Sequence, residues 1–148
     1  MKINPGIFAL LVGLTAPLAS NAGEIHSAVR TGNMPVIQAL LASDKELLSA
    51  KDVNGWAPLH WAVWQGNVDT VRYLLETGAV VSATTLHGDT PLHLAAEKGS
   101  PEILNLLIEK KADVKVQNKR GESPLYTGRV AGQKAAVEVL VQKGVPGE

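Results

Sequence analysis

The sequence contains no cysteine, and this absence removes several kinds of chemistry. Without a thiol, the chain has no disulfide framework, no thiolate zinc site and no cysteine nucleophile. The absence leaves the cellular compartment open, because a cysteine-free protein tolerates oxidising and reducing surroundings alike. The compartment must therefore be inferred from other features of the chain.

An excess of either charge is missing as well. Lysine plus arginine and aspartate plus glutamate each total 14 among the 148 residues, so the formal net charge is zero. Such a chain has no overall attraction for nucleic acid or for an anionic membrane. Its length and its 45% hydrophobic content suit one compact domain or one short repeat array. We therefore expect one folded unit and no nucleic-acid partner.

Residues 1–22 have the features of a secretory signal peptide. Lys2 precedes an apolar stretch at residues 7–14, and the small residues of Ser20-Asn21-Ala22 indicate cleavage after Ala22. The apolar stretch is far shorter than the ~20 residues that a helix needs to span a bilayer, which argues against the alternative of an uncleaved anchor. We expect export to a bacterial periplasm or secretion, although a eukaryotic secretory signal would look similar.

Cleavage would change the charge and leave no long apolar segment. Loss of Lys2 leaves 13 of the 14 basic residues against 14 acidic ones, a net charge of −1. No later segment approaches transmembrane length, so we expect no membrane span after cleavage.

A six-residue motif recurs with a fixed period of 33 residues. It reads G-W-A-P-L-H at residues 55–60, G-D-T-P-L-H at 88–93 and G-E-S-P-L-Y at 121–126. A second glycine recurs at the same interval, at Gly66, Gly99 and Gly132. Apolar residues follow it at helical spacing, such as Val68, Val71 and Leu74. This pattern predicts two short helices, joined by a glycine, in each unit.

The motif itself has the chemistry of a helix start. Thr90 and Ser123 are residues that cap a helix through the hydroxyl, and the proline that follows suits the first helical position, where no N–H is needed. Ala62 and Ala95 lie one turn further on, where small side chains allow two helices to approach closely. We therefore expect the two alanines to be packing residues.

The repeated motif resembles the ankyrin repeat. The family's Thr-Pro-Leu-His-x-Ala pattern is matched completely at residues 90–95 and closely at 57–62, and a weaker copy begins at Ile25. The resemblance implies an all-α fold, an ankyrin-repeat solenoid of four helix-turn-helix units with short β-turn fingers. The repeat domain is expected at residues 23–148, in units of about 23–51, 52–84, 85–117 and 118–148.

Two departures from the repeat pattern are informative. The last unit has Tyr126 in place of histidine and Gly128 in place of alanine, with a polar second helix, as a terminal cap would. Lys111 stands where neighbouring copies have Gly78 and Gly144, at a helix end that favours a left-handed backbone. We expect a glycine at this position to be more stable than the lysine.

The histidines are the first candidates for chemistry. The resemblance implies that His60 and His93 hydrogen-bond the backbone of the turn region. A pair stacked ~10 Å apart in adjacent repeats is too widely spaced to share one metal ion. No nucleophile, phosphate-loop or paired-carboxylate motif points to an active site. We therefore expect no enzyme, no cofactor and no metal.

The three tryptophans all fall in one unit, although aromatic residues make up only 4% of the chain. Trp61 takes the place of an apolar leucine, which predicts a core residue. Trp56 and Trp64 stand where other copies carry charged residues, so we interpret them as an exposed pair and a binding hot spot. The alternative is a local aromatic cluster, with the pair folded against Trp61 or His60.

The expected function is that of a non-catalytic protein–protein interaction module, because the resemblance implies binding through finger tips and the concave face of the first helices. The partner is another protein that the sequence does not identify, and the chain is expected to be a monomer. The candidate partner-binding residues are Trp56, Trp64, Gln65, Leu86, Asp89, Glu97, Lys98, Lys119, Arg120 and Glu122. The alternative is a small-ligand or metal binder, or an enzyme, that uses the tryptophan and histidine cluster of the second unit.

Overall fold

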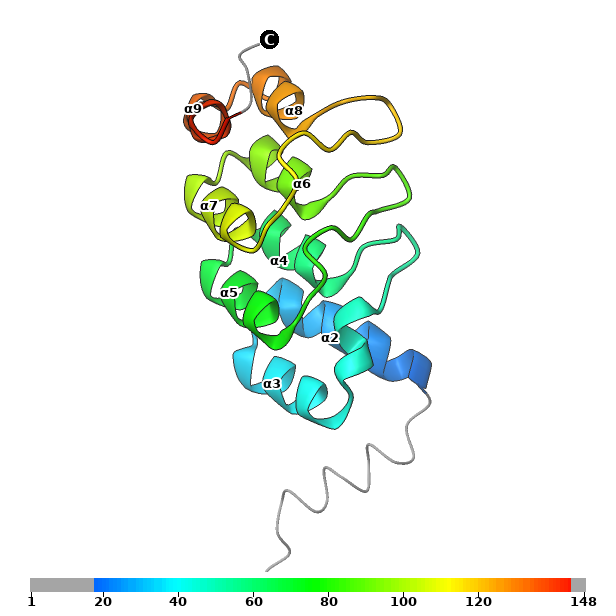
Figure 1. The fold of residues 1–148 in the computed structure, drawn as a ribbon. Coiled ribbons are helices and arrows are strands. Elements are labelled where there is room, and N and C mark those ends of the chain that lie inside the picture. The colour runs from blue at the N-terminus through cyan, green and yellow to red at the C-terminus, as the bar shows by residue number, and fades with distance from the viewer. Residues whose placement is uncertain (1–17, 145–148) are drawn as a thin grey trace, which may run out of the picture.

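The computed structural model describes residues 18–144, and its helices stack in antiparallel pairs along one axis (Figure 1). The helices are α2 (Leu18–Thr31), α3 (Met34–Ser43), the 3-10 helix η1 (Lys45–Ser49), α4 (Pro58–Gln65), α5 (Val68–Thr77), α6 (Pro91–Lys98), α7 (Pro101–Glu109), α8 (Pro124–Val130) and α9 (Lys134–Gln142). The described part contains no strand. The predicted all-α repeat solenoid is confirmed.

The helices form two rows. The first helices of the pairs, α2, α4, α6 and α8, lie in one row, and the second helices, α3, α5, α7 and α9, lie in the other (Figure 1). The long loops before α4, α6 and α8, which we call fingers, project beside the first row (residues 50–57, 78–90 and 110–123). We call the side made by the first helices and the fingers the inner face.

The first helices begin as the motif predicts, with one correction. Pro58, Pro91 and Pro124 occupy the first helical position. The Ser123 hydroxyl accepts a hydrogen bond from the Tyr126 N–H at 3.2 Å and so caps α8. The expected hydroxyl cap by Thr90 is wrong, because its Oγ1 lies 2.9 Å from Nδ1 of His93 instead.

The core runs the length of the stack between the two rows. Ala62 and Ala95 are completely buried, which confirms their prediction as packing residues. The motif leucines Leu59, Leu92 and Leu125 are each 1% exposed and belong to a single cluster that also contains the buried residues of α2. Because the cluster is continuous, each unit buries its apolar face only against its neighbours.

The N-terminal pair begins with α2, the longest helix among residues 18–144. Ile25 and Val29 of α2 are buried, and His26 donates from Nε2 to the Ala50 carbonyl at 2.9 Å. The predicted cleavage after Ala22 falls inside α2, and only Gly23 and Glu24 separate it from the buried side chain of Ile25. The rest of the predicted signal peptide, residues 1–17, lies outside the described residues.

Lys111 confirms the conformation that its position predicts. It has φ +67°, and it is the only non-glycine residue of the described part with a positive φ; Gly78 and Gly144 have φ +111° and +94°. A side chain in the left-handed region is strained, whereas glycine is not.

We predict that Lys111→Gly raises the free energy of unfolding by ~1 kcal/mol, because glycine removes this strain. Urea unfolding followed by circular dichroism measures the change. Lys110→Gly is the matched control, since Lys110 is the neighbouring lysine with φ −85° and should gain nothing. A midpoint that is unchanged or lower in Lys111→Gly would refute the prediction.

Candidate partner-binding surface

The three tryptophans form one cluster on the inner face. The Trp56 ring centroid lies 4.7 Å from that of Trp61, 5.6 Å from that of Trp64 and 6.2 Å from that of His60. All three indoles are partly buried against the core. The expectation of an exposed pair at Trp56 and Trp64 is therefore wrong, because the rings pack against one another as in the alternative of a local aromatic cluster. Trp61 is likewise half-buried and only borders the core.

Asp52 holds the cluster in place, and sequence reasoning missed it. One carboxylate oxygen accepts the backbone N–H groups of Asn54 and Trp56 at 2.9 Å, and the other accepts the indole N–H of Trp61 at 2.9 Å. Partial burial by itself raises the pKa of Asp52, but the three hydrogen bonds outweigh it and the pKa lies below its ordinary value. Asp52 is thus ionised at neutral pH.

Two cations flank the cluster from the neighbouring units. The guanidinium carbon of Arg30, on α2, lies 5.4 Å from the Trp61 ring centroid. Nζ of Lys98, on α6, lies 4.3 Å from the Trp64 ring centroid. The structure therefore brings together two predicted site residues, Trp64 and Lys98, that are 34 positions apart.

The fingers lie side by side and are joined through the backbone. The Leu86 N–H donates to the Asn54 carbonyl at 3.2 Å, and the Lys119 N–H donates to the His87 carbonyl at 3.0 Å. The Leu86 side chain at the tip is 59% exposed. An apolar side chain is thus presented to solvent on a row of turns that are hydrogen-bonded to one another.

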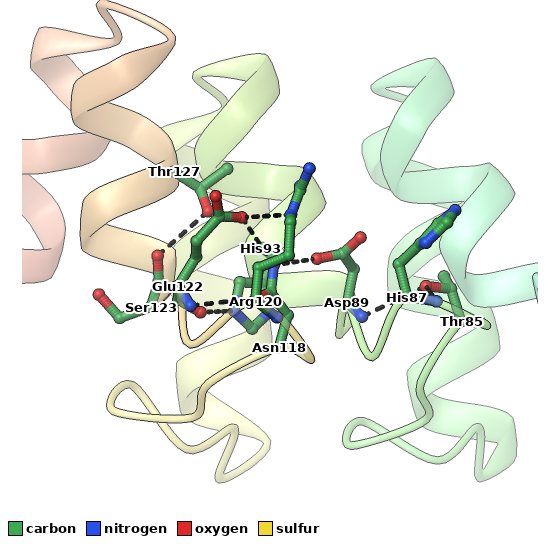
Figure 2. Close-up of polar contacts among 9 residues, drawn as sticks. All are labelled: Thr85, His87, Asp89, His93, Asn118, Arg120, Glu122, Ser123 and Thr127. Atoms are coloured by element: carbon green, nitrogen blue, oxygen red, sulfur yellow. Dashed lines mark hydrogen bonds and ion pairs between the residues drawn. The ribbon is translucent and has the colours of Figure 1, made fainter.

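A polar network ties the last two fingers together (Figure 2). Nδ2 of Asn118 donates to Asp89 at 2.8 Å and to Glu122 at 3.0 Å, while Arg120 lies 2.9 Å from Glu122. Asp89 and Glu122 are half-buried, although solvated side chains were expected there. Asn118, which the sequence analysis missed, is the residue that joins them.

The predicted site residues thus divide into two groups. Some are exposed: Gln65, Leu86, Glu97, Lys98, Lys119 and Arg120. Others are half-buried: Trp56, Trp64, Asp89 and Glu122. All lie on the fingers, on α4 or on α6, and therefore on the inner face.

The repeat histidines make the backbone bonds that the resemblance implies. Nδ1 of His60 accepts the Ala57 N–H at 3.0 Å, and its Nε2 donates to the Ala83 carbonyl at 3.0 Å. His93 does the same with Thr90 at 3.1 Å and with the Glu122 carbonyl at 2.9 Å. Burial lowers the pKa of both rings, although the carbonyl bonds oppose this shift.

Other features bear on the ligand-binding alternative. A hollow of about 200 Å³ lies between η1 and the start of α4, lined by residues such as Leu48, Leu59 and Val80, and no tryptophan lines it. Among residues 18–144 no group of three or more histidine or acidic side chains is placed to hold a metal. None of the helices in this part is both long and apolar enough to cross a membrane.

The comparisons with known proteins agree with this geometry. The family model for ankyrin repeats, in three copies, matches residues 10–85 and 80–146. The chain belongs to the ankyrin-repeat family. Ankyrin repeats are a protein–protein interaction module and are generally non-catalytic.

Similar proteins include several built around the same repeat. Ankyrin repeat domain-containing protein 40 of Mus musculus is 36% identical over 56 residues, which are 38% of this chain and 15% of that protein. Protein phosphatase 1 regulatory subunit 27 of Mus musculus is 34% identical over 73 residues, 49% of this chain and 47% of that protein. The 2-5A-dependent ribonuclease of Mus musculus is 34% identical over 67 residues, 45% of this chain and 9% of that protein. The match spans less than half the length of each.

We predict that the protein loses stability as the pH falls below 6.5, the ordinary pKa of histidine. The unfolded chain then binds protons that the buried rings of His60 and His93 exclude, since their folded-state pKa is lower. Urea midpoints at about pH 7.5 and about pH 5.5 measure the loss. Removal of one of the two rings provides the control, because His93→Gln should weaken the pH dependence. A midpoint that does not fall on acidification would contradict this role.

We also predict that Gly88→Ala destabilises the protein more than Gly121→Ala. Both glycines have positive φ, +80° and +77°, so both substitutions carry backbone strain of ~1 kcal/mol. At Gly88 the added Cβ would also lie 2.9 Å from the Lys119 nitrogen in the next finger, whereas at Gly121 it meets open space. Equal losses in the free energy of unfolding would show that the contact between fingers is unimportant.

Proposed function

We propose that the chain is a non-catalytic binding module that holds another protein on its inner face. The proposed surface consists of Trp56, Trp64, Gln65, Leu86, Asp89, Glu97, Lys98, Lys119, Arg120 and Glu122. One observation supports this most strongly: three half-exposed indoles lie together on the side where the fingers and first helices meet. Tryptophans that are partly covered by their neighbours combine a large apolar contact area with little loss of side-chain entropy on binding.

The geometry also favours a flat protein contact over a small-molecule site. The tryptophans pack against one another and are partly buried, and the exposed Leu86 extends the apolar surface onto the next finger. Charged residues surround this centre, as in many protein interfaces. A rigid stack presents these groups already ordered, which reduces the entropic cost of binding.

We further propose that the protein is exported, to a periplasm or to the extracellular space, and that it acts there as a monomer. The support is the signal-like sequence of residues 1–22. The intact mass of protein isolated from its own cells tests this, because cleavage after Ala22 would leave a chain that begins at Gly23. A mass that includes residues 1–22 would refute cleavage.

The binding proposal predicts that Trp64→Ala weakens the partner complex at least about tenfold, as loss of a central aromatic contact does. The partner is first captured from the exported fraction by crosslinking and identified by mass spectrometry, and its affinity is then measured with purified components. Tyr73→Ala is the matched control. It removes a half-buried aromatic side chain from α5, in the second row of helices.

The two variants distinguish the outcomes. Loss of affinity in Trp64→Ala with retention in Tyr73→Ala, when both are folded by circular dichroism, supports the surface. Equal affinities in the two variants and the wild type would place the binding site elsewhere.

A further inference from the structure

We propose that the inner face recognises an acidic segment of its partner, with carboxylates bound by Arg30 and Lys98 and an apolar side chain packed against Trp56 between them. This inference rests on the proposed function and specifies the chemistry of the partner. The five residues Arg30, Trp61, Trp56, Trp64 and Lys98, which we call the cation–tryptophan row, carry the argument.

The row is continuous across three units of the stack. Arg30 lies over Trp61, Trp56 contacts both Trp61 and Trp64, and Lys98 lies over Trp64. The two cations come from α2 and α6, and the indoles come from α4 and the finger before it. The row therefore exists only when the units are stacked, and the stacking places one cation at each end of it.

Both cations lack an acidic partner within the described residues. Arg72 pairs with Glu102 and Arg120 pairs with Glu122, and neither of these ion pairs involves the row. Contact with an indole face orients a cation and leaves its N–H groups free to donate. Arg30 and Lys98 are thus positioned donors that a carboxylate can accept from directly.

The nearby carboxylates do not satisfy these cations. Asp52 is already bonded to two backbone N–H groups and to the indole N–H of Trp61. Glu97 is exposed, but it directly precedes Lys98 on α6, and consecutive helical residues do not face each other. The charge presented at the two ends of the row is therefore positive.

This arrangement selects against other partners. A basic segment would bring its charges to the indole faces that Arg30 and Lys98 occupy, and like charges brought together oppose binding. A nucleic-acid strand needs a continuous track of cations and free aromatic faces for stacking. Here two separate cations flank indoles that contact one another, in a chain of zero net charge. Spaced carboxylates with an apolar residue between them fit better.

A phage-displayed library of random linear peptides, selected on the purified protein, tests the inference without knowledge of the natural partner. We expect the selected peptides to be acidic and to contain an aromatic or large aliphatic residue. A synthetic copy of a selected peptide should bind the Lys98→Glu variant about tenfold more weakly than the wild type. Its affinity for the Lys98→Gln variant should also be lower than for the wild type. Lys110→Glu is the matched control, because it makes the same charge change on an exposed lysine at the end of α7.

Selection on the double variant Arg30→Glu with Lys98→Glu provides the stronger result, since the charge of the selected peptides should change from acidic to basic. Neutral or basic peptides that bind the wild type and lose affinity for Trp64→Ala would overturn the acidic preference but leave the proposed function standing. Selected peptides with undiminished affinity for Trp64→Ala would overturn both. A single-stranded DNA oligonucleotide that binds the row more tightly than the selected peptides would show that phosphate, not carboxylate, is the preferred anion.

Discussion

The stack depends on the hydrogen bonds of a buried histidine in the first helix of a pair, as in α2, α4 and α6. In α4 and α6 the histidine Nδ1 accepts a backbone N–H at the start of its own helix. Its Nε2 donates to a backbone carbonyl in the next finger. One neutral ring thus satisfies a helix terminus and joins two units at once. His26 makes the corresponding contact from α2 to Ala50. Each of these bonds joins a finger carbonyl to the preceding unit; the Glu122 carbonyl also accepts the Asn118 N–H of its own finger at 3.0 Å.

This stacking determines which side chains lie next to one another on the inner face. Because the first helices are fixed side by side, residues separated by one repeat become neighbours, and side chains from three units form one surface. Lys98 reaches Trp64, and Arg30 reaches Trp61, only across unit boundaries. The Asp52 carboxylate orients the indoles through its hydrogen bond from the Trp61 indole N–H. The inner face is therefore formed by neighbouring units together and not by any single helix pair.

The sequence predicted those features that depend on local geometry. The 33-residue period, the prolines at the helix starts, the packing alanines and the left-handed Lys111 each follow from one residue type at one position. The histidine bonds followed from the resemblance to ankyrin repeats. The division into units at residues 23–148, the signal peptide and the partner-binding residues stay predictions.

What the sequence did not predict depends on side chains meeting across the fold. Trp56 folds onto Trp61 because Asp52 turns the finger back, and Asn118 joins Asp89 to Glu122 across two fingers. Thr70 is completely buried with a hydroxyl that has no hydrogen-bond partner, where the next unit has Ile103. Periodicity marks such positions as interior or exterior, but it does not determine which rotamers and partners fill them.

The histidine bonds also give the stack a direction. Each ring is carried by an earlier segment of the chain and donates to a carbonyl further along it, so every finished pair of helices presents a ready donor to the segment that follows. A polypeptide that emerges from a ribosome or a translocation pore with its N-terminus first could therefore lay down one unit at a time on a completed surface. Growth of this kind resembles a crystal that extends from a seed, in which the order of synthesis and the order of assembly coincide.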